Sequence, residues 1–262
     1  MYAMKKLLIL FLVVSCSTQT YANEIYFQNY GLREGLSSNL VFGIAEDRDG
    51  ALWLATVTGI DKFDGLNFKH YELPDITING ISDYMNTYIS SDSKGNIWAA
   101  TRSGLVYKYS LDKDQFEMAY KFVNPENPTA RVFVHSFYFD NRDKILVSLT
   151  YGLSILDTDT FEEVILTSNP SIYKISQDSK NNYYFSDNNK IKIWSPPFEE
   201  IQTIFPAGKQ NLAQLRITNF YVDEERHQIW GVSRNEGIFI ADLKTKEISY
   251  PEELRQFQGL AV

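Results

Sequence analysis

The histidines are the first side chains to weigh as acids, bases or metal ligands. They are His70, His135 and His227, and no two of them have the spacing of ligands to one metal ion. His70 falls in an expected outer strand and His227 in a turn, whereas His135 begins an expected inner strand and could face a central channel. We therefore expect no metal site, and we keep His135 as a candidate base.

Other groups with catalytic potential lack a partner in the sequence. The paired acids Glu199–Glu200 and Glu252–Glu253 are adjacent, so their carboxylates point apart on an exposed segment. Ser37 and Ser38 do not lie in the glycine-framed turn that exposes a serine nucleophile. The sequence thus predicts no catalytic residues, no cofactor and no enzymatic activity.

The balance of charge argues against one class of partner. The 262 residues include 25 Lys and Arg against 33 Asp and Glu, which gives a formal net charge of −8. Phosphate backbones are bound by basic surfaces, so nucleic acid is not an expected partner. Hydrophobic residues make up 44% of the chain, a composition typical of a folded domain, and Cys16 is its single cysteine, which leaves no internal disulfide.

The first 22 residues have the pattern of a signal peptide. Lys5 and Lys6 precede an apolar run over 7–14, and a small-x-small site over 20–22 ends at Ala22. An alternative is lipidation of Cys16, because residues 13–16 (VVSC) resemble a bacterial lipobox. We favour cleavage after Ala22, and either alternative predicts export to the periplasm.

The rest of the chain contains a repeat of about 45 residues. Segments 47–59 (DRDGALWLATVTG) and 92–104 (DSKGNIWAATRSG) align without a gap, and the pattern recurs more loosely after Asp140, Asp178 and Asp223. Repeats of this length are typical of propellers and solenoids, in which each unit buries its apolar face against the next. We count five copies.

Each copy contains four short apolar strands separated by turn signals. In the first copy, these signals are D-x-x-G at 47–50, a turn that ends at Gly59, and Asp64-Gly65. Asp side chains bond the backbone of such turns and Gly supplies positive φ. Four antiparallel strands per repeat form one propeller blade. The sequence therefore predicts an all-β fold, a β-propeller of four-stranded antiparallel blades with about five blades present.

The copies also give the expected domain boundaries. After a leader over 1–22, the propeller covers 23–262, with blades over 32–75, 76–125, 126–168, 169–208 and 209–255. Residues 256–262 are expected to start a sixth blade, so we expect the propeller to be incomplete in this chain. The recurring Trp53, Trp98 and Trp230 are expected to pack between blades.

Residues 35–71 (GLSSNLVFGIAEDRDGALWLATVTGIDKFDGLNFKHY) closely resemble the two-component regulator propeller repeat. The resemblance covers 25–262, strongly in the first two copies and loosely afterwards. It implies a periplasmic sensor propeller, as in hybrid histidine kinases that respond to glycans or in receptors that end in a diguanylate cyclase. On this basis we expect an exported sensor module, truncated before a membrane-linked output domain, that signals through blade packing or homodimer contacts.

A ligand is expected where the links between blades and the turns between second and third strands share one face of the disc. The D-x-x-G turns lie on the opposite face. Arg, Tyr and Asn suit a polyhydroxylated or anionic ligand, such as an oligosaccharide. The candidate ligand-binding residues are Asn39, Thr56, Asn86, Arg102, Arg131, Tyr151, Asn188, Arg216 and Arg234.

Two other functions remain open. Propellers similar to virginiamycin B lyase repeat a comparable D-x-x-G-x-x-W phrase and use a metal-bound site with a histidine base, a role that would fall to His135 here. The third hypothesis is a scaffold propeller that binds another protein through a wide face of the disc.

Overall fold

The computed structural model describes residues 28–74, 77–78, 81–82, 84, 87–168, 172–187, 190–196, 200–205, 217–234 and 236–257. The chain divides into two compact units, residues 1–30 and 31–262, and the described strands belong to the second. The expected leader over 1–22, with both of its processing alternatives, lies outside the described residues. Among the residues described, no helix has the length and apolar character needed to cross a membrane.

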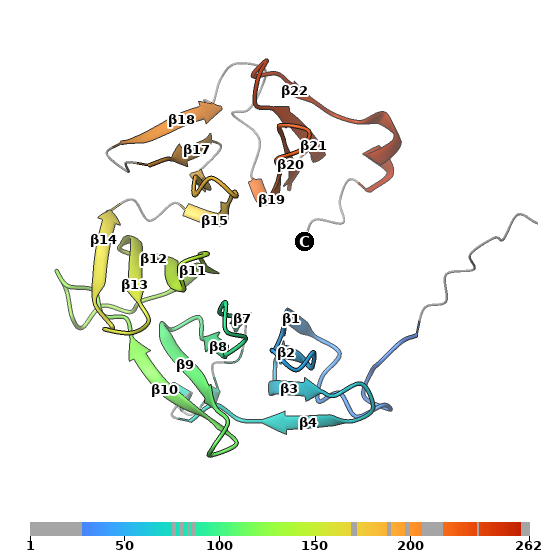
Figure 1. The fold of residues 1–262 in the computed structure, drawn as a ribbon, viewed down its shortest axis with the longest axis vertical. Helices are drawn as coiled ribbons and strands as arrows, with labels where there is room; N and C mark the ends of the chain where they lie inside the picture. The colour runs from blue at the N-terminus through green and yellow to red at the C-terminus, as the bar shows by residue number, and fades with distance from the viewer. Residues whose placement is uncertain are drawn as a thin grey trace, which may run out of the picture. The chain divides into compact units, whose positions relative to one another are not determined.

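Five antiparallel sheets of four strands follow one another along the chain, which confirms the predicted all-β propeller (Figure 1). Blade 1 comprises β1 (Val41–Glu46), β2 (Leu52–Thr56), β3 (Gly59–Phe63) and β4 (Phe68–Tyr71). Blade 2 comprises β7 (Tyr88–Ser91), β8 (Ile97–Ala100), β9 (Leu105–Ser110) and β10 (Gln115–Lys121). Blade 3 comprises β11 (Val134–Phe139), β12 (Lys144–Leu149), β13 (Gly152–Asp157) and β14 (Glu163–Thr167).

The last two sheets repeat this order. Blade 4 comprises β15 (Ile172–Gln177), β16 (Tyr183–Asp187), β17 (Lys190–Trp194) and β18 (Ile201–Phe205). Blade 5 comprises β19 (Ile217–Asp223), β20 (Gln228–Ser233), β21 (Gly237–Asp242) and β22 (Ile248–Ser249). The strands of each sheet fall inside the residue range expected for one blade.

Two short elements lie outside the blades. A hairpin of β5 (Thr77–Ile78) and β6 (Ile81–Ser82) belongs to the link between blades 1 and 2. A 3-10 helix, η2 (Glu252–Phe257), follows blade 5 and contacts β21. Residues 256 and 257, where we expected a sixth blade to begin, therefore end this helix, and residues 258–262 lie outside the description.

The D-x-x-G turns explain how each blade begins. In blades 1 to 4 one oxygen of the leading aspartate accepts hydrogen bonds from the backbone N–H groups two and four residues later, at 2.8–3.0 Å. The fourth turn residue always has positive φ, and it is Gly50, Gly95, Asp143 and Asn181 in the four blades. Asp and Asn tolerate this conformation better than most residues other than Gly. The turn thus keeps its geometry where its sequence pattern is lost.

The apolar core lies between consecutive blades. Trp53 is fully buried in the cluster that joins blades 1 and 2, together with Tyr107 and Phe116. Trp98 is buried in the same way between blades 2 and 3. Burying a side chain of this size stabilises the fold by about 1.5–3 kcal/mol or more. Trp230 is only half-buried, and its neighbour Ile229 points into the cluster between blades 4 and 5.

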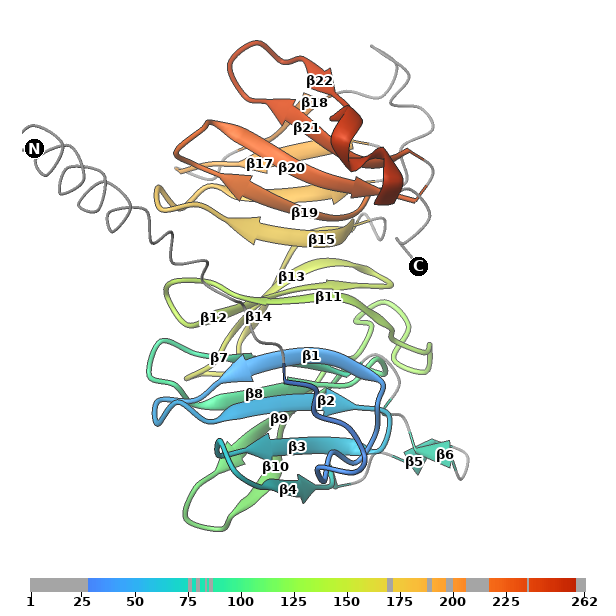
Figure 2. The same ribbon diagram turned by 90° about the vertical axis from the view of Figure 1, so that its right-hand side faces the viewer.

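The strand connections define two sides of the propeller unit. The first strand of each blade contacts the first strand of the next, from β1 through β7, β11 and β15 to β19. The β1–β2 and β3–β4 types of turn lie at one side, which we call the turn side. The β2–β3 type of turn and the links lie at the other, the link side. In Figure 2, β1 points to the left, toward the turn side, and the β5–β6 hairpin marks the link side at the right.

Candidate ligand-binding groove

The structure describes six of the nine predicted ligand-binding residues, all at strand ends or connections on the link side. They are Asn39, Thr56, Arg102, Arg131, Tyr151 and Arg234; the other three, Asn86, Asn188 and Arg216, lie outside the described residues. Asn39, Arg102, Arg131 and Arg234 are exposed, Tyr151 is half-buried and Thr56 is buried. Their surroundings differ, and two of them border one groove.

Thr56 has a structural environment. Its side chain is fully buried, and its hydroxyl donates to the carbonyl of Gly59 at 3.0 Å. The same oxygen lies 3.1 Å from the hydroxyls of Ser37 and Thr58. These contacts close the β2–β3 turn and attach the segment before β1 to it.

Tyr151 belongs to a polar contact between blades 2 and 3. Its hydroxyl donates to Glu163 at 2.7 Å, and the hydroxyl of Tyr120 donates to the other oxygen of that carboxylate at 3.1 Å. Burial, together with the charge of Glu163, raises the pKa of Tyr120 to about 12 and raises the pKa of Tyr151 further. Both phenols therefore stay protonated and keep donating across the ordinary pH range.

Arg102 and Arg131 border the same groove, formed by the link between blades 2 and 3. The link starts at Phe122, whose N–H donates to the carbonyl of Gly104 at 2.9 Å. It ends at Val134, whose N–H donates to the carbonyl of Arg102 at 2.8 Å. A single β8–β9 turn therefore holds both ends of a loop of roughly a dozen residues, which gives it the closed form of an Ω-loop.

Gly104 is required at the base of this loop. Its φ is +85°, and a Cβ there would lie 3.2 Å from Val132 and 3.3 Å from Phe122. Both of these side chains are buried in the cluster between blades 2 and 3. The absence of a side chain at Gly104 lets the two ends of the loop pack side by side.

The outer part of the loop is organised by Asn124 and Asn127. The side-chain oxygen of Asn124 accepts from the N–H groups of Glu126 and Asn127, at 3.0 and 3.2 Å. The carbonyl of Asn127 accepts from Ala130 at 2.9 Å, and its side-chain oxygen accepts from the hydroxyl of Thr129 at 2.9 Å. Side-chain-to-backbone bonds of this kind fix a turn without regular secondary structure.

The loop and the strands β9 and β10 enclose a groove of about 490 Å³. This volume falls within the range of about 300–1,000 Å³ typical of small-molecule sites. The groove is mostly apolar, with a few polar and charged groups. Its lining residues are Ser103, Leu105, Met118, Lys121, Phe122, Val123 and the loop segment 128–133.

Two cationic side chains line this groove, and a third contacts one of its lining residues. Lys121, at the end of β10, and Arg131, in the loop, are exposed lining residues. The guanidinium of Arg102 lies 5.3 Å from the ring centre of Phe133, another lining residue. None of the three forms an ion pair with a carboxylate within the described parts of the chain. The groove can therefore accept a negatively charged group.

Sequence reasoning placed Arg102 and Arg131 on the correct side but missed Lys121, Met118 and Phe133. Lys121 and Met118 lie in β10, where no ligand-binding residue was predicted. A usable signal was the long, proline-containing link between two strands, because loops of this length in compact domains are often functional. The sequence of residues 124–131 (NPENPTAR) carries that signal.

His135, the candidate base, lies on β11, one residue after the loop is attached to Arg102. It is half-buried, and burial, assisted by the positive charge of Arg102, lowers the pKa of its imidazole. In the regions that the structure describes, no group of three or more His, Cys, Asp or Glu side chains could hold a metal ion.

Ser37 and His70 come together through a carboxylate that the sequence did not indicate. The buried Asp61 accepts the N–H of Ser37 at 2.7 Å and lies 2.8 Å from Nδ1 of His70. The hydroxyl of Ser37 interacts instead with Thr56 and Thr58. The carboxylate thus holds the segment before β1 against the outer strand of blade 1.

The comparisons with known proteins agree with this architecture. Residues 35–58 match the family model of the two component regulator propeller. Histidine kinase P4 of Formosa agariphila is 36% identical over 63 residues, which are 24% of this chain and 5% of that protein.

Solved structures extend the likeness to most of the chain. The extracellular domain of a hybrid two component system of B. thetaiotaomicron matches 86% of this chain and 31% of its own, with 22% identity and a TM-score of 0.63. A second such domain from that organism matches 85% and 31%, with 22% identity and a TM-score of 0.61. PorZ, a surface component of the type-IX secretion system of Porphyromonas gingivalis, matches 79% and 33%, with 15% identity and a TM-score of 0.59.

The chain therefore spans about a third of the length of these solved structures. At such identities the likeness establishes the fold, and the family match identifies the repeat. The predicted resemblance is confirmed: residues 35–58 are a two component regulator propeller repeat, within a chain that has the β-propeller fold of these extracellular domains.

Proposed function

We propose that this chain is an extracytoplasmic ligand-sensing propeller of a bacterial signal-transduction receptor, of the two-component or cyclic-di-GMP type. The observation that carries this proposal is the match of residues 35–58 to the two component regulator propeller. The similarity to a histidine kinase and the shared fold with extracellular domains of hybrid two component systems support it. Export by the leader over 1–22 and a periplasmic location are parts of the same proposal.

The ligand, an oligosaccharide or another small molecule, binds on the link side. The groove between β9, β10 and the 122–133 loop supports this location, because it combines an apolar wall with a few polar groups. Lys121 belongs to blade 2, and Arg131 lies just before blade 3. A ligand held by both changes the packing of these two blades or the contacts of a homodimer, and a membrane-linked output domain receives that change.

Thermal unfolding of the purified chain tests the sensing function. A ligand that binds only the folded state at about 100 times its Kd stabilises it by about 2.7 kcal/mol. For a chain of this size we expect the melting temperature to rise by roughly 5–10 °C. The measurement is a melting curve in the presence of a broad panel of neutral and acidic oligosaccharides.

An unchanged melting temperature across the whole panel contradicts the sensing proposal. Metal-dependent turnover of a small lactone or glycan by the same sample would instead favour the lyase hypothesis. In that case His135→Ala should abolish the turnover, since His135 is the candidate base. Binding of another protein without any small-molecule response would favour the scaffold hypothesis.

A further inference from the structure

We propose that the groove of blade 2 binds an oxyanion, a carboxylate or a sulfate, carried on a ring-shaped ligand with an apolar face. Lys121 and Arg131 hold the oxyanion, and the wall that includes Met118 and Phe133 contacts the ring. This inference rests on the sensing function proposed above and specifies the chemical class of its ligand.

The two cations that line the groove favour an anionic ligand. Acidic residues outnumber basic ones by 33 to 25, so carboxylates are plentiful as partners for surface cations. Lys62, Lys144 and Lys192 each form an ion pair with an aspartate, whereas other described cations, such as Lys180 and Lys244, form none. Lys121 and Arg131 line one cavity, yet neither forms an ion pair with any carboxylate that the structure describes. Two such cations at a cavity favour an anionic ligand over a neutral one.

The wall of the groove offers exposed apolar surface to a ligand. Met118 is 48% exposed although it is a large apolar side chain, and it lines the groove together with Phe133. An apolar ring that covers Met118 would remove this surface from water. The hydroxyl of Thr129 already donates to Asn127, so polar recognition falls mainly to the two cations.

The loop that forms the groove is held in place at both ends. Both ends of the 122–133 loop are attached by backbone hydrogen bonds to the turn at 102–104, and Val132 anchors the loop in the core. The stacking of Arg102 on Phe133 fixes one more wall residue. A groove formed before the ligand arrives avoids the entropic cost of ordering a loop on binding.

Calorimetry with matched probes tests the proposal. Purified chain is titrated with D-glucuronate against D-glucose, and with galactose 6-sulfate against galactose. The first pair tests the carboxylate and the second the sulfate. We expect at least one charged probe to bind at least about tenfold more tightly than its neutral counterpart. Its affinity should fall as salt concentration rises, because the cations are exposed.

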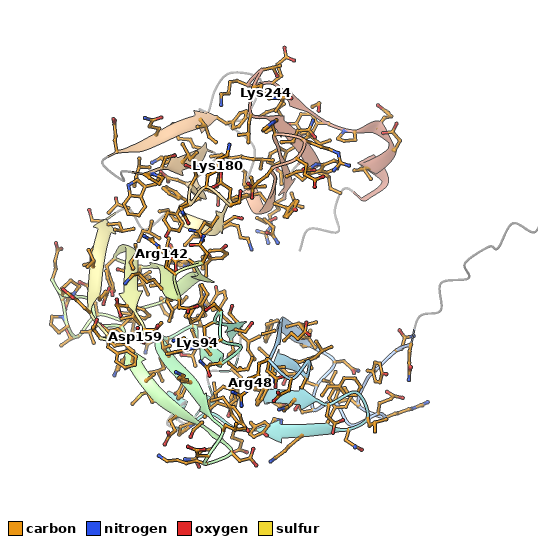
Figure 3. The ribbon with its side chains drawn as sticks, in the orientation of Figure 1. Arg48, Lys94, Arg142, Asp159, Lys180 and Lys244 are labelled. Atoms are coloured by element: carbon orange, nitrogen blue, oxygen red, sulfur yellow. The ribbon has the colours of Figure 1, made fainter. Side chains whose placement is uncertain are left out.

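A double variant, Lys121→Gln with Arg131→Gln, locates the binding. We expect it to weaken binding of the charged probe by at least about tenfold. The matched control is Lys180→Gln with Lys244→Gln. It also removes two positive charges, but from the turn side. Figure 3 labels Lys180 and Lys244, and both belong to turns, between β15 and β16 and between β21 and β22. The control should leave affinity unchanged, and melting curves confirm that both variants are folded.

Three results overturn the proposal: no binding of either charged probe at millimolar concentration, equal binding of charged and neutral probes, or full affinity in the groove variant. These failures are separable from a failure of the sensing function. A ligand from the oligosaccharide panel that stabilises wild type and groove variant equally would disprove binding in the groove, but it would still support the sensing function. A panel without any response would contradict sensing itself.

Discussion

In blade 1, the second oxygen of the turn aspartate Asp47 accepts the indole N–H of Trp53 at 2.8 Å, within the same blade. In blade 3, the corresponding oxygen of Asp140 accepts the hydroxyl of Tyr183, which belongs to blade 4, at 2.6 Å. The guanidinium of Arg142 adds bonds to that oxygen at 3.0 and 3.1 Å. The second oxygen of the turn aspartate therefore bonds within its own blade in blade 1, whereas in blade 3 it joins two blades.

The difference follows from one position in the repeat. Trp53 and Trp98 lie six residues after the turn aspartate, and blade 3 has Leu146 there, which cannot donate a hydrogen bond. In both blades the first oxygen of the aspartate accepts hydrogen bonds from backbone N–H groups of the turn. Local turn geometry is thus maintained while the partner of the second oxygen changes. The turn aspartate therefore contributes a hydrogen bond to the next blade in blade 3, whereas in blade 1 its second oxygen bonds a side chain of its own blade.

The largest expected effect is that of Asp140→Ala. The aspartate side chain is fully buried, and its removal leaves the hydroxyl of Tyr183 and two turn N–H groups without their acceptor. Losing the acceptor of a buried donor typically costs about 1–3 kcal/mol, and because three donors lose it here we expect a total of about 3–5 kcal/mol, measured by urea unfolding. Tyr183→Phe, which removes one hydroxyl, should cost about 1–2 kcal/mol. A cost below about 1 kcal/mol for Asp140→Ala would contradict the inter-blade role.

The turn aspartates also show what the sequence could predict. Asp47 and Gly50 act through their own backbone neighbourhood, so their pattern predicted the strands, the blades and the sides of the propeller. Asp143 takes positive φ without being glycine, which explains why the pattern weakens without loss of the fold. The groove was less predictable, because it is formed by a loop whose path depends on two hydrogen bonds to a turn distant in the sequence and on packed side chains.

The predicted site residues divide in the same way. Arg102 and Arg131 are set by strand order, and the structure places them at one groove. Thr56 shares their side of the molecule, but its hydroxyl closes a turn. Topology determines the side on which a residue lies, whereas local hydrogen bonding decides whether its side chain is available to a ligand.

The second effect concerns the space around two turn glycines. Gly50 and Gly95 both have positive φ, +83° and +74°. A Cβ at Gly95 would lie 2.6 Å from the backbone nitrogen of Arg48 in blade 1. A Cβ at Gly50 would have only Glu46 nearby, at 3.8 Å. Asn tolerates positive φ, so Gly50→Asn should cost less than about 1 kcal/mol. Gly95→Asn must displace the neighbouring turn, and we expect about 2–3 kcal/mol by urea unfolding. Equal costs would show that the two turns do not pack as closely as the structure indicates.

The third effect isolates the indole hydrogen bond of blade 1. Burial acts to raise the pKa of Asp47, but bonds from Trp53 and Lys62 hold that pKa below its ordinary value. Trp53→Phe keeps an aromatic ring and removes the donor, so we expect a loss of about 1–2 kcal/mol at neutral pH. Asp47→Ala and the double variant with Trp53→Phe complete a double-mutant cycle, which isolates the bond because the loss of ring size is common to both backgrounds. Chemical unfolding of these variants separates the bond from the packing.

The smallest effect is that of Ser93→Ala, which removes a contact between the turns of blades 2 and 3. The hydroxyl and N–H of Ser93 donate to the carboxylate of Asp143 at 2.6 and 2.7 Å, and these bonds lower the pKa of Asp143 from its ordinary 3.8. The contact is exposed, so we expect the hydroxyl to contribute only about 0.5 kcal/mol at neutral pH.

Because the pKa is lower in the folded state, this contribution is present above about pH 4 and is lost as pH falls through the folded pKa. The difference in unfolding free energy between wild type and Ser93→Ala should therefore shrink below pH 3.8. In an Asp143→Asn background the same substitution should show no such pH dependence, because the titrating group is gone. A difference that persists unchanged at low pH would mean that the serine acts through the backbone of its own turn, and that the blades are joined at this point by packing alone.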